Sequence, residues 1–106
     1  MFMNFEKIHA IEWKEGIGYS WTDDCAFNTI KTPFKTVFDV TKELCANNCK
    51  TTLGCTHYFW ENTKISASFV PHYQVCYMRK EIVYKSDVVV YNPGYPTSCG
   101  IVYQGN

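Results

Sequence analysis

Alternating and apolar-rich segments along the chain predict several short β-strands. Residues 55–60 (CTHYFW) alternate so that successive side chains fall on opposite faces of an extended chain, as in a strand. Other runs are rich in β-branched or aromatic residues, which fit a pleated surface, and are bounded by Gly, Pro, Asn or Asp. They predict extended structure over 17–27, a turn at Pro33 with a short strand up to residue 38, and strands over 75–79, 87–91 and 100–103.

One segment, residues 41–50 (TKELCANNCK), predicts a helix. Asp39 or Thr41 can cap its N-terminus, and Glu43 suits the positive end of the helix dipole. Its two cysteines are four residues apart and therefore lie on one face. One helix with several short strands predicts an α+β fold in which the helix packs on a small antiparallel sheet.

The length and composition predict a single folded domain. The chain has 106 residues, of which 46% are hydrophobic and 19% charged, as in ordinary globular proteins. Residues 1–16 carry few turn signals and are expected to form a leading segment with room for one short strand. Residues 17–106 are expected to form the domain.

The balanced charge argues against partners, such as nucleic acid, that are bound through a strong electrostatic field. Ten basic residues match ten acidic ones, and Arg79 is the single arginine, so a basic surface for nucleic acid is not expected. The balanced charge and ordinary globular composition lead us to expect neither nucleic-acid binding nor membrane insertion, and the oligomeric state stays open. The chain opens without an apolar run of signal-peptide length, which leaves the route of export open.

Six cysteines are the strongest signal in the sequence. Zinc sites usually need close CxxC pairs, whereas here the short spacings are x3 and x5. An even number of cysteines in a short chain predicts a disulfide framework and hence a secreted protein in an oxidising compartment. The cysteines are Cys25, Cys45, Cys49, Cys55, Cys76 and Cys99.

Catalytic motifs are missing from the sequence. It contains no G-x-S-x-G, Walker A, H-E-x-x-H or G-x-G-x-x-G pattern. His57, next to Cys55 in a predicted strand, is interpreted as a packed structural histidine rather than a general base. Asp23 and Asp24 fit a solvated turn better than a calcium site, because no ligand loop accompanies them. We expect a protein that is not an enzyme and has no cofactor or metal.

The order of the cysteine motifs resembles a known family. Trp21 and the CAF beginning at Cys25 precede a C-x3-C-x5-C triplet, and the triplet runs into GCTHYFW at 54–60. CYMRK at 76–80 and CGIV at 99–102 follow. Over about four-fifths of the chain this pattern resembles the PAN/apple family, in particular its short extracellular variants.

The resemblance implies both the disulfide pairing and a class of function. It implies the pairs Cys25–Cys99, Cys45–Cys76 and Cys49–Cys55, a pairing that spacing alone leaves open. PAN/apple domains are adhesion units, so it also implies a secreted, non-catalytic module that binds carbohydrate or protein at an extracellular surface.

Residues 61–75 depart from the short variants, which often have a Gly-rich turn there. This segment contains no glycine and gathers apolar residues around Phe69. It can be a contact surface, an inert hairpin extension or additional core. As a contact surface, the 65–73 loop supports an alternative function, that of a secreted effector or inhibitor that blocks a target protein.

The excess of tyrosine points to candidate contact residues. Core packing explains most of the aromatic content, but tyrosine near loops is also an effective anchor for protein or sugar faces. Asn62, Gln74, Asn92 and Glu61 could supply the polar half of a sugar site. The candidate ligand-binding residues are Trp60, Phe69, Tyr73, Tyr91, Asn92 and Tyr95.

Overall fold

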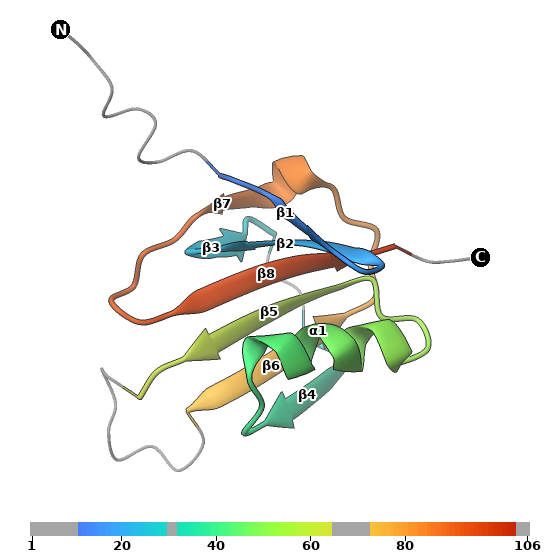
Figure 1. The fold of residues 1–106 in the computed structure, drawn as a ribbon, viewed down its shortest axis with the longest axis horizontal. Helices are drawn as coiled ribbons and strands as arrows, with labels where there is room; N and C mark the ends of the chain where they lie inside the picture. Colours follow the sequence, from blue (N-terminus) through green and yellow to red (C-terminus); the bar gives the residue numbers. More distant parts are fainter. Residues whose placement is uncertain (1–10, 30–31, 65–72, 104–106) are drawn as a thin grey trace, which may run out of the picture.

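The computed structural model describes residues 11–29, 32–64 and 73–103, and these form the predicted α+β fold. Six strands make one sheet in which every neighbouring pair is antiparallel (Figure 1). In spatial order they are β1 (Lys14–Gly16), β2 (Tyr19–Asp23), β8 (Thr97–Val102), β5 (His57–Asn62), β6 (Gln74–Arg79) and β4 (Lys35–Phe38). A separate two-stranded ribbon pairs β3 (Cys25–Phe27) with β7 (Val88–Val90), which follows the 3-10 turn η2 (Lys85–Asp87).

The helix α1 (Lys42–Thr51) covers one face of the large sheet (Figure 1). Thr41 is its N-cap, and the Thr41 hydroxyl accepts a hydrogen bond of 3.2 Å from the Leu44 N–H. Cys45, Ala46 and Cys49 are buried in the core that the helix shares with the sheet. One short apolar face of α1 therefore forms the buried part of the helix–sheet contact.

Strand β5 shows how alternation builds two cores. Tyr58 and Trp60 belong to the core beneath α1, together with Met78 of β6. Phe59 packs on the opposite face, in a second cluster around Phe27 of the β3–β7 ribbon. The period-2 pattern of the sequence thus supplies one face to the helix and the other to the ribbon.

Three disulfides join these layers, and their pairs are those that the resemblance to PAN/apple domains implies. Cys25–Cys99 links the ribbon to β8, and Cys45–Cys76 links α1 to β6. Cys49–Cys55 closes the turn between α1 and β5. The protein has no free cysteine.

Close packing dictates one residue of β8. Gly100 pairs with Tyr58 across the strands, and the fully buried Tyr58 ring lies where a Cβ atom on residue 100 would stand. A side chain there would have to displace a large ring from the core. Gly100 is therefore a packing requirement rather than a turn signal.

Several boundaries differ from the sequence-based prediction. β5 begins at His57 rather than Cys55, because residues 52–55 form the turn closed by the Cys49–Cys55 bridge. β8 begins at Thr97, three residues before the predicted strand, since it pairs on both sides with β2 and β5. β1 lies within the predicted leading segment and forms one edge of the sheet. In the described part of the chain, no helix has the length and apolar character needed to cross a bilayer.

Strand direction places different segments at the two ends of the sheet. β2, β4 and β5 end where β6 and β8 begin, because each of the first three is antiparallel to β6 or β8. The helix α1 also begins near this end, directly after β4. The ends of five strands and the start of α1 therefore converge there.

Candidate ligand-binding cleft

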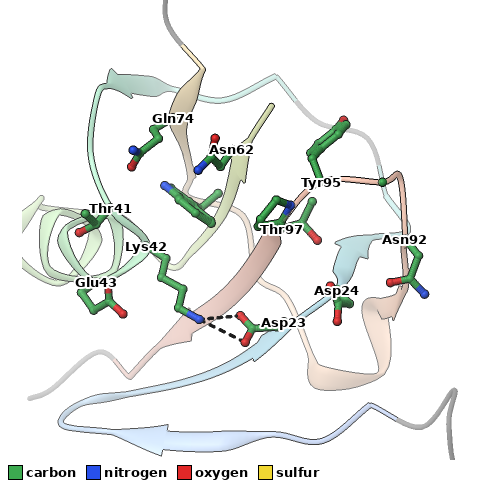
Figure 2. Close-up of a pocket in the computed structure, with 13 residues that line it drawn as sticks. Asp23, Asp24, Thr41, Lys42, Glu43, Asn62, Gln74, Asn92, Tyr95 and Thr97 are labelled. Carbon is green, nitrogen blue, oxygen red and sulfur yellow. Dashed lines mark hydrogen bonds and ion pairs between the residues drawn. The ribbon is translucent and has the colours of Figure 1, made fainter. Parts of the chain in front are cut away.

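A cleft of about 750 Å³ opens at the sheet end where these segments converge (Figure 2). The first turn of α1 lines one side, and the loop before β8 lines the other. The residues around it come from six parts of the chain: Asp23 and Asp24, Thr41 to Glu43, Trp60 and Asn62, Gln74, Asn92, and Gly94 to Thr97. A volume of this size accommodates a small-molecule ligand or a short oligomer.

Two buried residues form the fixed part of the lining. The Trp60 indole N–H donates a 2.7 Å hydrogen bond to the Val40 carbonyl, which ties β5 to the segment before α1. The Thr97 hydroxyl accepts a 3.0 Å bond from the Cys25 N–H. Because both polar groups are already satisfied and both side chains are buried, these residues hold the shape of the cleft.

The wall opposite α1 depends on an unusual backbone conformation at Asp24. Its φ of 54° lies in the left-handed region, which Asp tolerates better than most residues. The Asp24 N–H donates to the Thr97 carbonyl, and the Asp24 carbonyl accepts from the Tyr91 N–H. These bonds fix the turn, and the side chains of Asp24 and Asn92 both line this edge of the cleft (Figure 2).

Tyr95 is held by a small hydrogen-bonded group behind the cleft. Its hydroxyl donates to one Glu61 oxygen at 3.4 Å, and the Tyr77 hydroxyl donates to the other at 2.8 Å. A hydrogen bond with Tyr91, followed by burial, raises the pKa of Tyr95, while burial and the Glu61 bond raise the pKa of Tyr77 to about 12. Tyr95 thus stays neutral and offers its ring in one orientation.

An ion pair spans the lower part of the cleft. The Lys42 side chain extends from α1 toward Asp23 at the end of β2, as Figure 2 shows, and its ammonium lies 3.1 and 3.2 Å from the two carboxylate oxygens. The same ammonium lies 4.7 Å from the centroid of the Trp21 ring. The charge of Lys42 is therefore already compensated inside the protein.

The cleft gathers half of the predicted contact residues. Trp60, Asn92 and Tyr95 line it, and so do the amides of Asn62 and Gln74, which the sequence marked as a polar half-site. Glu61 lies behind Tyr95 instead.

The other predicted contacts lie elsewhere. Tyr91 adjoins Tyr95 but is not in the lining, since its ring packs near Phe59 with centroids 6.4 Å apart. Tyr73, just before β6, lies beneath the Lys64 ammonium. Phe69 and most of the 65–73 loop fall outside the described residues.

The residues that the sequence did not single out come mainly from the first turn of α1. The sequence predicts only a helix start for Thr41, Lys42 and Glu43. They line the cleft because α1 follows β4 directly and therefore begins at this end of the sheet. For Asp23 and Asp24 the sequence predicts a solvated turn rather than a calcium site, and both residues line the cleft. Within residues 11–29, 32–64 and 73–103, no group of three His, Cys, Asp or Glu side chains could hold a metal ion.

His57 lies away from the cleft, because it begins β5 while the cleft lies at the other end of that strand. Its side chain is buried, and burial together with the nearby Arg79 charge lowers its pKa to about 4. The environment of His57 is therefore that of a neutral, packed imidazole.

Comparison with protein-family models, curated proteins and solved structures gives no significant match for this chain. The chemistry of the cleft is therefore the basis for a functional assignment. Its side-chain amides donate and accept hydrogen bonds, its carboxylates accept them, and Trp60 and Tyr95 add apolar ring surface. Such a lining suits a ligand that is rich in hydroxyl groups and has apolar C–H faces.

Proposed function

We propose that this protein is a secreted, non-catalytic binding module that recognises a carbohydrate in the cleft. The observation that carries the proposal is the lining itself, which combines three side-chain amides, those of Asn62, Gln74 and Asn92, with the Tyr95 ring. Each amide presents donors and an acceptor, which match the paired donor and acceptor character of sugar hydroxyls. The ring supplies a flat, rigid surface for the C–H face of a sugar.

The rigidity of the cleft supports this function. Its lining is held by backbone bonds such as that from the Asn62 N–H to the Pro96 carbonyl, 3.0 Å long, and by the Glu61 contacts of Tyr95. The Cys25–Cys99 bridge fixes the chain next to Asp24. A site that is already ordered loses little conformational entropy on binding, so weak polar contacts suffice for recognition.

The disulfide framework supports the extracellular part of the proposal. Three bridges in a domain of this size are typical of proteins that work in an oxidising compartment. Their pairing, together with one helix packed on an antiparallel sheet, supports assignment to a PAN/apple-like adhesion module. In that role the scaffold would present the cleft at a cell or matrix surface.

A glycan array with the oxidised protein tests this function. We expect the wild type to bind a defined class of sugars, and Tyr95→Ala to lose roughly tenfold or more in affinity, as for a central aromatic contact. Asn92→Ala, a change at an exposed amide of the lining, should also weaken binding. Tyr84→Ala removes a tyrosine that is 65% exposed and outside the lining, so it should bind like the wild type.

Two results would contradict the proposal. One is an array without any bound sugar, and the other is binding that Tyr95→Ala and Asn92→Ala leave unchanged while both variants fold normally by circular dichroism. In the first case a pull-down with wild type and Phe69→Ala would test the effector or inhibitor alternative, because Phe69 lies in the apolar loop on which that alternative depends.

A further inference from the structure

The charges around the cleft are unevenly distributed. Asp23, Asp24 and Glu43 contribute three carboxylates to the lining, whereas Lys42 contributes the only cationic side chain among the described lining residues. Two of these carboxylates belong to exposed residues, Asp24 and Glu43. In Figure 2 they stand on opposite walls of the cleft, Glu43 on α1 and Asp24 at the end of β2.

The Lys42 ammonium does not attract an anionic ligand to the cleft, because it is already engaged by Asp23. Both oxygens of Asp23 contact its ammonium, and the Trp21 ring lies against it. An anionic ligand would have to compete with the Asp23 carboxylate for the same ammonium. The arginine that could otherwise grip a carboxylate or sulfate, Arg79, ends β6 and therefore lies at the far end of the sheet.

The start of α1 does not offset the charge either. A helix N-terminus attracts anions through its free N–H groups. Here the Thr41 hydroxyl already accepts from the Leu44 N–H, and Glu43 places a carboxylate in the first turn. The Thr41 cap and the Glu43 carboxylate therefore make this helix start less favourable for an anion.

We infer that the cleft selects saccharides that carry a protonated amine and discriminates against uronic-acid and sulfated sugars. This inference rests on the proposed function, since it names the class of sugar for the same cleft. The amine would lie near Asp24 or Glu43, because the three carboxylates of the lining outnumber its one cationic side chain, which is paired with Asp23. The amides and the Tyr95 ring would contact the neutral remainder of the sugar.

Three oligosaccharide probes of similar length separate charge from shape. Glucosamine oligomers carry amines, N-acetylglucosamine oligomers have the same backbone without charge, and galacturonic acid oligomers are anionic. By calorimetric titration in mildly acidic buffer, where the amines are protonated, we expect the glucosamine oligomer to bind most tightly and the galacturonate oligomer least. The preference for glucosamine over N-acetylglucosamine should shrink as salt is added, because exposed charges are screened.

Matched variants assign the preference to the cleft. Asp24→Asn keeps a residue that tolerates the left-handed conformation, and Glu43→Gln keeps the length of the side chain. Each change should cost up to roughly fivefold in affinity for the glucosamine oligomer, the range of exposed ion pairs, and cost less for the N-acetylglucosamine oligomer, so the preference for the amine should shrink. Glu12→Gln removes an exposed carboxylate outside the lining and should change neither affinity.

The outcomes distinguish this inference from the proposed function. Equal affinity for the charged and neutral oligomers, tighter binding of galacturonate, or a preference that survives the Asp24→Asn and Glu43→Gln double variant would overturn the charge selectivity and leave sugar binding in place. A wild type that binds none of the three probes and no sugar on the array would overturn both.

Discussion

His57 illustrates how one side chain is fixed by its surroundings. Its ring packs edge-on against Phe27, with the ring centroids 4.7 Å apart. Its Nδ1 lies 2.8 Å from the Thr56 hydroxyl, and that hydroxyl lies 2.6 Å from the Glu81 carbonyl, to which it donates. Since the hydroxyl has one proton to donate, Nδ1 must donate to it, so the neutral ring carries its proton on Nδ1.

The buried neutral state of His57 predicts a loss of stability in acid. The pKa is about 4 in the folded protein and 6.5 ordinarily, so below pH 6.5 the unfolded chain binds the proton first. The free energy of unfolding should fall by about 2 kcal/mol between pH 6.5 and 4 through this residue. NMR titration of the ring measures its pKa, and urea unfolding across the same pH range measures the free energy of unfolding. The variant His57→Gln should lose this part of the pH dependence. A ring that titrates near its ordinary pKa would contradict the account.

At the scale of elements, each disulfide ties together a different pair of segments. The bridges close loops of very different length, with sequence separations of 74 for Cys25–Cys99, 31 for Cys45–Cys76 and 6 for Cys49–Cys55. In the chain-entropy view, a longer loop means a larger restriction of the unfolded chain. All six cysteines are buried to a similar degree, so paired alanine variants create comparable cavities.

Pairwise removal of the bridges should therefore give a graded series. We expect losses in the free energy of unfolding of about 4 kcal/mol for Cys25→Ala with Cys99→Ala and slightly less for Cys45→Ala with Cys76→Ala. Cys49→Ala with Cys55→Ala should cost about 2 kcal/mol. Denaturant unfolding of the three variants measures the order. A largest loss from the shortest loop would show that local strain or packing, rather than chain entropy, controls these bridges.

Local patterns predicted the elements better than their ends. The helix was predicted at 41–50 and runs over Lys42–Thr51, because capping by Thr41 is a local property of the chain. Strand β8 begins earlier than predicted, since Thr97 and Ser98 are polar and their extended conformation comes from pairing with β2 and β5 on either side. Tertiary pairing of this kind leaves no periodic signal in the strand itself.

At the scale of the whole molecule, the cleft depends on topology. Trp60, Asn92 and Tyr95 were identified from residue type, as aromatic or amide side chains near loops. Lys42 and Glu43 looked like an ordinary first turn of a helix, and their place in the lining follows from the antiparallel order that brings β4 and α1 to the end of β2. Residue types therefore indicate the chemistry of the site, while the pairing order of the sheet determines which residues line the same cleft.

The central claim is that the cleft binds a sugar, and NMR of the isotope-labelled protein tests it most directly. During titration with the glucosamine oligomer, the side-chain amide signals of Asn62, Gln74 and Asn92 should shift together and saturate with one dissociation constant. The signal of Asn28, an exposed amide outside the lining, should stay in place. Shifts that gather elsewhere while the three amides remain unmoved would contradict the account.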